Sequence, residues 1–213
     1  MKPKVISAIC TLAISGVALL QSSYPAAGAE APGSTVSLAD LRNQLAMLQT
    51  EVSGVVEGMN AVKGSAKKPA ELSQAVASLG HSFDALQNRV NTLQTNAVTV
   101  KARVKEHYEA WSKQLTGMSN PNLREKAQER LTESQKQFDK IVQEATTAKE
   151  ELLPFVSSAK DIVIYLNADL SADAVDTLSG DIWKLGNKAK SVNSSIGDVI
   201  EQIDRTIKGL PQK

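Results

Sequence analysis

Histidine is the side chain best suited to acid–base and metal chemistry near neutral pH, and the sequence has two, His81 and His107. His81 precedes Asp84 by three residues, so the two share one face of a helix, but two ligands are too few for a zinc site. His107 has Glu106 and Glu109 nearby but lacks the Glu-x-x-His pairs by which facing helices hold two metal ions. We therefore expect a solvated His81 and a partly buried His107 that is hydrogen-bonded to a neighbouring carboxylate.

Acidic side chains are numerous but alternate with basic ones. Glycosidase or proton-transfer chemistry requires two carboxyl groups in unlike environments at one cleft, whereas interleaved charges are typical of a solvated helix flank. The interleaved residues are Glu129, Glu133, Glu144, Glu150, Glu151, Lys126, Lys136, Lys140 and Lys149. The sequence also has no Gly-x-Ser-x-Gly elbow and no glycine-rich phosphate loop. We therefore predict a protein that is not an enzyme and has no catalytic, cofactor-binding or metal-binding residues.

The amino-terminal residues have the pattern of a cleaved secretory signal. Lys2 and Lys4 precede an apolar stretch from Val5 to Leu20, which is short for a membrane span of about 20 residues. Ala27-Gly28-Ala29 then supplies the small residues that signal peptidase requires. We predict a signal peptide at 1–29, cleavage after Ala29, and export to the periplasm or the medium; the alternative is an uncleaved membrane anchor.

Cleavage would remove the only cysteine, Cys10, and leave a chain without disulfide or thiol chemistry. It would also remove two of the 24 Lys and Arg residues, leaving 22 against 23 Asp and Glu, a formal charge of minus one. Because nucleic-acid affinity rests on a surplus of basic residues that face phosphates, this balance argues against a nucleic-acid partner.

Apolar residues recur in four long runs, with steps that alternate between three and four residues. Such spacing places an apolar stripe along each helix and favours packing of helices along their length. No run shows two-residue alternation, so no sheet is expected. The predicted helices are 37–63, 70–117, 121–166 and 172–208, after a flexible segment 30–36. Together, 37–213 should form one all-α domain: an elongated antiparallel bundle or coiled coil of three long helices, with the shorter amino-terminal helix laid along part of them.

The breaks between the runs have recognisable helix-end signals. Gly117 ends the second predicted helix, the Asn120 side chain can cap the third, and Pro121 suits the first helical position. So short a break makes these helices antiparallel neighbours. Pro154 falls inside the third run and removes one backbone hydrogen bond, so we predict a kink there with the apolar stripe continuing. The interior of such a rod leaves little room for the small-molecule pockets of about 300 to 1,000 Å³ found in many proteins.

A set of positions around the second break, Pro154 and the last break carries a family resemblance. These are Trp111, Leu115, Ser119, Asn120, Leu123, Arg124, Leu131, Pro154, Phe155, Asp161, Val163 to Leu166, Leu170, Ala172, Ala174 and Val175. With them the chain resembles, over roughly 97–210, a bacterial family of exported helical proteins known as domain of unknown function 2959. The resemblance implies a coiled-coil-rich exported protein and assigns no catalytic residue.

Five residues are candidate contacts for a partner: Trp111, Asn120, Leu123, Arg124 and Trp183. The first four surround the second break, where Trp111 lies on the apolar stripe. Trp183 follows the stripe residue Ile182 and has two interpretations. We favour burial in the bundle core; the alternative is an exposed contact for another chain, since large aromatic residues are enriched at interface hot spots.

These observations lead us to expect a non-enzymatic exported scaffold or protein-binding module of the bacterial cell envelope. Its partner would be an envelope protein or a second copy, because an apolar stripe buries itself equally well within one chain or between two. The alternative is a peripheral envelope protein that binds a lipid or membrane surface. Membrane contact is not favoured, because it needs basic residues massed on one helix face and the charges here are mixed.

Overall fold

The computed structural model describes residues 36–208, which form four α-helices and no strand. The helices are α1 (Leu38–Ser65), α2 (Pro69–Thr116), α3 (Pro121–Ala168) and α4 (Ala172–Lys208). Their ends lie within two residues of the expected positions, and the prediction of an all-helical protein is confirmed. The predicted signal peptide, its cleavage site at Ala29, and residues 30–35 and 209–213 lie outside the described residues.

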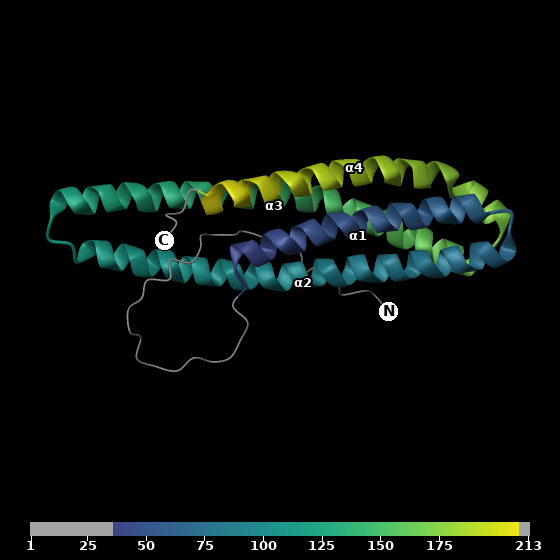
Figure 1. Ribbon diagram of the computed structural model, residues 1–213, viewed down its shortest axis with the longest axis horizontal. Helices are drawn as coiled ribbons and strands as arrows, with labels where there is room; N and C mark the ends of the chain where they lie inside the picture. Colours follow the sequence, from purple (N-terminus) through teal and green to yellow (C-terminus); the bar gives the residue numbers. More distant parts are fainter. Residues whose placement is uncertain (1–35, 209–213) are drawn as a thin grey trace, which may run out of the picture.

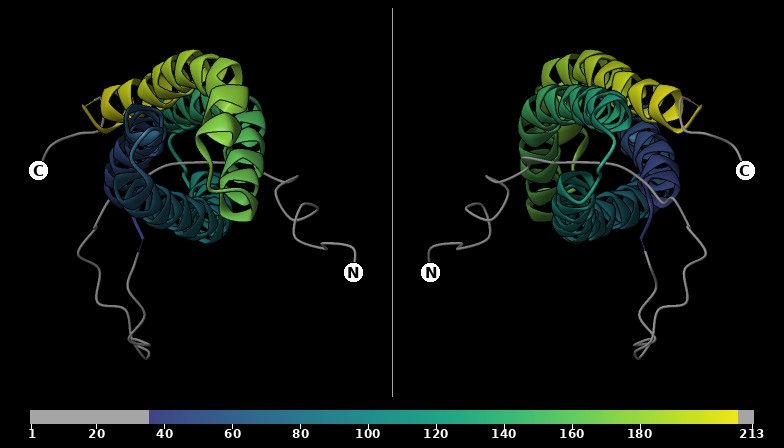
Figure 2. Two further views of the ribbon diagram at one scale, coloured as in Figure 1. Left: turned by 90° about the vertical axis from the view of Figure 1, so that its right-hand side faces the viewer. Right: turned by 90° about the vertical axis from the view of Figure 1, so that its left-hand side faces the viewer.

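The four helices run along one long axis and form a ring when viewed from the end (Figures 1 and 2). α1 packs against α2 and α4, and α3 packs against the same two helices from the other side. The pairs α1–α3 and α2–α4 therefore face each other across the diagonals. α1 thus runs along part of the longer helices, as expected, but it does so as one wall of a four-helix ring and not against three long helices packed with one another.

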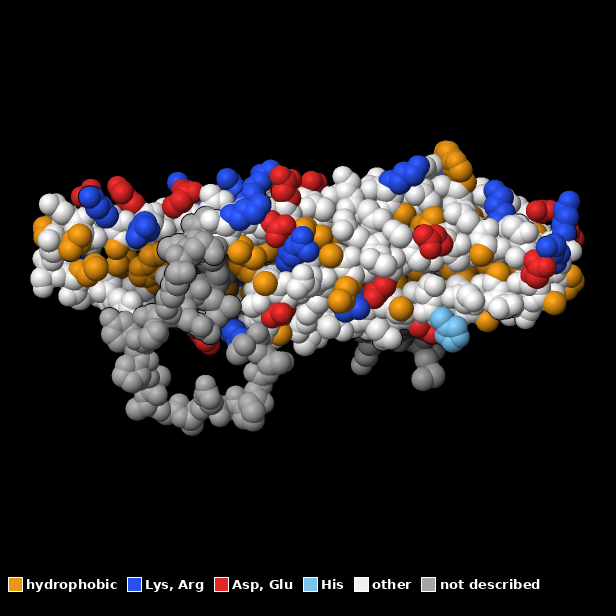
Figure 3. All heavy atoms as spheres, viewed as in Figure 1, with side chains coloured by type: hydrophobic (Ala, Val, Ile, Leu, Met, Phe, Trp, Pro, Cys, Tyr) orange, Lys and Arg blue, Asp and Glu red, His pale blue; other side chains and the backbone are white. Residues whose placement is uncertain are grey.

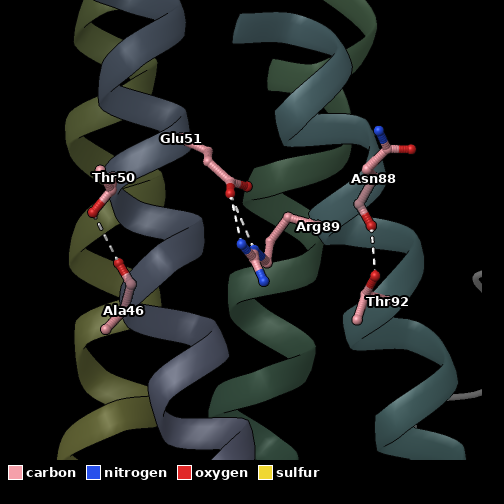
Figure 4. Close-up of polar contacts among 6 residues, drawn as sticks. All are labelled: Ala46, Thr50, Glu51, Asn88, Arg89 and Thr92. Carbon is pink, nitrogen blue, oxygen red and sulfur yellow. Dashed lines mark hydrogen bonds and ion pairs between the residues drawn. The ribbon is translucent and has the colours of Figure 1, made fainter.

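Polar side chains tie α1 to α2. Arg89 donates from Nε and Nη2 to Oε1 of Glu51, at 3.1 and 3.0 Å, and both side chains are largely buried between the two helices (Figure 4). Two turns further along, Nδ2 of Asn96 donates to Oε1 of Gln44 at 2.8 Å. Because these contacts join residues far apart in the sequence, they fix the register of α1 against α2.

A second set of polar contacts ties α1 to α4. Gln49 donates to the backbone carbonyl of Asn193 at 2.7 Å, and the Asn193 side-chain amide donates to the Ser53 hydroxyl at 3.1 Å. Nearer the start of α1, Arg42 forms an ion pair with Asp204 at 3.2 Å. These bonds account for the position of α1, since side chains on both flanks of its apolar stripe have partners on different helices.

The apolar stripes predicted from the sequence meet in the centre of the ring. The largest fully buried side chains come from all four helices: Met59, Leu72, Leu79, Leu86, Phe138, Phe155, Leu166, Ile196 and Ile203, with Val52, Val55 and Val62. α3 is uninterrupted through Pro154, and both Leu152 and Phe155 beside it are buried, so the stripe continues past the proline. The kink at Pro154 stays a prediction.

The start of α1 is held by a reciprocal cap. The backbone N–H of Asp40 donates to Oγ of Ser37 at 3.1 Å, while the Ser37 backbone N–H and hydroxyl both donate to Oδ2 of Asp40 at 2.8 Å. This capping box satisfies donors that the first turn of a helix leaves unpaired. The backbone N–H of Ser37, and then its hydroxyl, lower the pKa of Asp40 below its usual value because they stabilise the carboxylate.

Candidate functional site

The hairpin formed by α2 and α3 extends past the ends of the other two helices (Figure 1). The pairing of Glu51 with Arg89 sets the antiparallel register of α1 and α2. With this register, Leu38, where α1 begins, lies beside Ala102 of α2. The part of α2 beyond Ala102 therefore has no α1 beside it.

α4 also ends short of the hairpin tip. Nε2 of Gln202 donates to Oε1 of Gln137 at 3.3 Å, which sets the register of α4 against α3. With this register, Lys208, the last described residue of α4, lies beside Leu131 of α3. We call residues 103–130 the projecting hairpin.

Three ring side chains cluster on α2 in the projecting hairpin, and one of them contacts α3 at the base of the hairpin. Tyr108 is buried, and its hydroxyl lies 3.2 Å from the hydroxyl of Ser134 on α3. The ring of His107 lies 6.0 Å from that of Tyr108 and 5.9 Å from that of Trp111, between centroids. His107 is half-buried as expected, but its structural contacts are these rings rather than the expected carboxylate. Burial raises the pKa of Tyr108, so its phenol stays protonated at neutral pH.

The tip of the hairpin is a tight, capped turn. Oδ1 of Asn120 accepts the backbone N–H groups of Asn122 and Leu123 at 3.1 and 3.3 Å, which confirms Asn120 as the cap of α3. Beside it, the side chain of Leu123 is 55% exposed and that of Met118 is 38% exposed. Arg124 is exposed next to them. Three candidate contacts, Asn120, Leu123 and Arg124, thus lie together with Met118 at the tip.

The surface around this tip is polar. Because the described part of α4 ends beside Leu131, one face of α3 along the projecting hairpin has no other helix of residues 36–208 against it. This end of α3 carries Pro121, Arg124, Glu125, Gln128 and Glu129, and the polar residues Thr132, Glu133 and Lys136 continue past Leu131. Leu123 and Met118 are therefore apolar exceptions at the end of a charged arm. Figure 3 shows the apolar side chains of the arm gathered between its two helices.

Trp183 does not belong to this cluster. It lies on α4 in the half farther from the tip, and its side chain is 69% exposed. The favoured interpretation of Trp183 as bundle core is therefore wrong. In this ring the buried stripe of α4 runs through Leu178, Ile182 and Leu185, and the residue after Ile182 points outward instead of toward another helix. Trp111, by contrast, is half-buried against the core of the hairpin.

Neither histidine takes part in a cluster of metal ligands. His81 is exposed, as is Asp84. Within residues 36–208, no group of three or more His, Cys, Asp or Glu side chains is placed to hold a metal ion. No helix in the same part of the chain is long and apolar enough to cross a membrane.

A family model described as protein of unknown function (DUF2959) matches residues 50–210, which is more than half of the chain. The chain belongs to the DUF2959 family. The matched region contains all of α2, α3 and α4 and the later part of α1. Comparison with curated proteins and with solved structures gave no match. The family description names no activity.

One feature of this DUF2959 member was missed by sequence reasoning: an apolar cavity of about 120 Å³, here called the central cavity, between all four helices. It is smaller than most small-molecule pockets. Lys149, expected on a solvated flank, is half-buried and contributes to its wall. The lining residues are Leu38, Leu41, Leu45, Leu48, Val90, Leu93, Gln94, Ala97, Ile141, Ala145, Ala148, Lys149, Leu152, Leu153, Ile196, Val199 and Ile203.

Proposed function

We propose that this DUF2959 member is a non-enzymatic scaffold or protein-binding module of the bacterial cell envelope, and that the tip of its projecting hairpin is the contact surface. The observation that supports this most is the exposure of Leu123 and Met118 at the end of an otherwise polar arm. Apolar side chains at such a place gain free energy when a partner removes them from water. Arg124 beside them would supply a charged contact at the rim.

The mechanism would be spacing and recognition. From Ala102 to Thr116 the arm rises about 20 Å beyond the start of α1, as estimated from the helical rise. At its base Tyr108 of α2 contacts Ser134 of α3, and the turn is held by Asn120. A partner would therefore meet a preorganised surface, which lowers the entropy cost of binding.

The sequence supports two parts of this proposal, the coiled-coil packing and the export of the protein. The three–four spacing of apolar residues supports coiled-coil packing of the helices, and the pattern of residues 1–29 supports export. Lipid-surface binding is a weaker alternative, because blue and red side chains are interleaved on the face seen in Figure 3 rather than separated. Flotation with anionic vesicles tests that alternative, which would gain support from clear recovery of the protein with the vesicles.

Site-specific photo-crosslinking in cells tests the role of the tip. A photoreactive residue is placed either at Leu123 or at Ile164, which lies at the other end of the same helix. The two positions are matched, since their side chains are 55% and 56% exposed. We expect discrete crosslinked products from position 123 and none of comparable yield from position 164.

A second variant shows whether products at the tip reflect recognition. Met118→Asp, combined with the photoreactive residue at position 123, places a charge in the proposed contact without touching the bundle, and should reduce the yield by at least tenfold. Equal products from both positions, or products unaffected by Met118→Asp, would contradict the proposal.

A further inference from the structure

The outer face of α4 carries a tryptophan that the bundle does not bury. Trp183 is 69% exposed, more than any other large hydrophobic side chain of residues 36–208. A large apolar side chain in water gains free energy when a second surface covers it, and tryptophan is enriched among the residues that dominate protein interfaces. The residues around Trp183 indicate which surface this is.

Four exposed residues share one side of α4 with Trp183. Asp176 lies seven residues before it and Lys190 seven residues after it, which is two helical turns in each direction. Gly180 lies three residues before it and Asn187 four after it, and Nζ of Lys190 is 3.4 Å from Oδ1 of Asn187. We call these five residues the Trp183 face. It has an acidic residue at one end, an aromatic ring in the middle and a basic residue at the other end.

This order of residues is complementary to itself. When two copies of α4 pack antiparallel about a twofold axis at Trp183, a residue seven positions after Trp183 faces the residue seven positions before it in the second copy. Lys190 then lies opposite Asp176 of the second copy, and the same pair forms again on the other side of the axis. A parallel pair would place like charges together at both ends. The charges therefore favour the antiparallel pair and disfavour the parallel one.

The Trp183 face has both the space and the free charges that such a pair needs. A Cβ placed on Gly180 would have no neighbouring atom within 4 Å, so two helices can approach closely beside the tryptophan rings. Neither Asp176 nor Lys190 forms an ion pair with another residue of 36–208. Their charges are therefore available to a second copy.

We propose that the protein associates with a second copy of itself through the Trp183 face, with the two α4 helices antiparallel and Trp183 at the twofold axis. One helix face on each copy buries less area than the roughly 2,000 Å² or more of permanent dimers. The association is therefore weak, with a Kd on the order of 100 μM, and the dilute protein is a monomer with Trp183 exposed.

The antiparallel pair has a consequence for the shape of the dimer. Because Trp183 lies in the half of α4 farther from the projecting hairpin, the two hairpins point away from each other at opposite ends. Their tips are roughly 100 Å apart, as estimated from the helical rise along α4 and then α3. The Trp183 face is separate from the tip, so self-association does not depend on the function proposed for the tip.

Sedimentation equilibrium of the purified protein tests the association itself. Between about 5 and 500 μM, a range that brackets the expected Kd, the average mass should rise from that of one chain toward that of two. A mass that stays at one chain over the whole range would overturn the proposal. So would a mass that rises past two chains, because an interface about a twofold axis closes at the dimer.

Replacement of Trp183 tests which surface is involved. Trp183→Ala should weaken self-association at least tenfold, as expected for a residue at the centre of an interface. Val98→Ala is the matched control, since Val98 is 55% exposed on α2, and it should leave the association as it is. Circular dichroism of the dilute monomers should give the same melting temperature for both variants within two degrees. If Trp183→Ala associates like the unaltered protein, another surface is responsible and the proposal fails.

Exchange of charges tests the antiparallel register. Asp176→Lys alone, or Lys190→Asp alone, places like charges together at both ends of the pair and should weaken self-association about tenfold. A mixture of these two variants should form mixed dimers as tightly as the unaltered protein, because every lysine again faces an aspartate. Asp84→Lys makes the same change on the exposed surface of α2 and should have no effect. Single variants that associate normally, or a mixture that does not regain association, would contradict this register.

Discussion

Asn120 controls the geometry of the hairpin tip more than any neighbouring residue. Its side-chain oxygen accepts two backbone N–H groups of α3, and Pro121 follows at the first helical position, where a missing N–H costs nothing. The cap keeps the exposed Leu123 and Met118 in a fixed orientation at the end of the arm. Loss of this one side chain should therefore affect both local stability and recognition.

Asn120→Ala should lower the free energy of unfolding by about 1 kcal/mol, the usual loss for a helix cap. Urea denaturation followed by circular dichroism measures it. Ser119→Ala is the matched control in the same turn and should change stability by only a few tenths of a kcal/mol. A negligible loss in Asn120→Ala would mean that Ser119 or water already satisfies these N–H groups.

The capping box of α1 gives stability a pH dependence that can be measured. Because the pKa of Asp40 in the fold lies below its usual value of 3.8, the carboxylate contributes stability above that pH and the contribution is lost as the pH falls through the lowered pKa. Asp40→Asn should therefore lower the melting temperature at pH 7, and the difference from the unaltered protein should close in acid. A difference that stays constant from pH 7 down to pH 2 would contradict this origin.

The exposure of Trp183 predicts a small effect on folding. Trp183→Ala should shift the melting temperature by less than one or two degrees, because a side chain that is 69% exposed contributes little to the core. Phe155→Ala is the contrasting variant, since Phe155 is fully buried and its removal should cost about 3 to 5 kcal/mol. Differential scanning calorimetry compares the two; a large loss in Trp183→Ala would show that another chain or an ordered contact buries it.

Single residues differ in how well the sequence predicts them. Asn120 and Pro121 were predictable because a cap depends on residues within one helical turn. The exposure of Trp183 was not, because a residue beside the apolar stripe is buried or exposed according to which helix lies next to it. The same holds for Lys149, which resembles its solvated neighbours in sequence but is half-buried and contributes to the wall of the central cavity.

At the scale of helices, α1 is the element whose role the sequence left least defined. Its apolar stripe predicted a helix and its length, but the same stripe fits a peripheral helix or a full wall of a bundle. Its partners lie far away in the sequence: Arg89 of α2 bonds Glu51, and Asn193 of α4 bonds Ser53. Such contacts depend on the tertiary register, which local spacing does not encode.

The Glu51–Arg89 contact should couple α1 to α2. In a double-mutant cycle with Glu51→Gln and Arg89→Met, we expect a coupling free energy of about 1 kcal/mol, at the upper end for pairs near a surface, because both partners are largely buried. The exposed pair Lys184–Asp181 on α4 is the control and should give a few tenths of a kcal/mol at most. Equal coupling free energies in the two pairs would mean that the Glu51–Arg89 contact stabilises the fold no more than an exposed ion pair does.

At the scale of the whole molecule, the structure is a slender four-helix bundle that narrows to a two-helix arm. Four apolar stripes, read from the sequence, predicted the slender shape. They did not predict the central cavity, because that depends on Ala97, Ala145 and Ala148 lying at one level, and their level is set by the register of α2 against α3. Alanines in an apolar stripe are a signal that can be searched for once this register is known.

The most direct test of this account is small-angle X-ray scattering of the protein without residues 1–29, at concentrations where light scattering reports a monomer. Helices of 48 residues should give a particle about 70 Å long, with a radius of gyration of roughly 20 to 23 Å. A compact sphere of this chain length would give about 16 Å instead. A value near 16 Å would contradict both the slender bundle and the projecting hairpin.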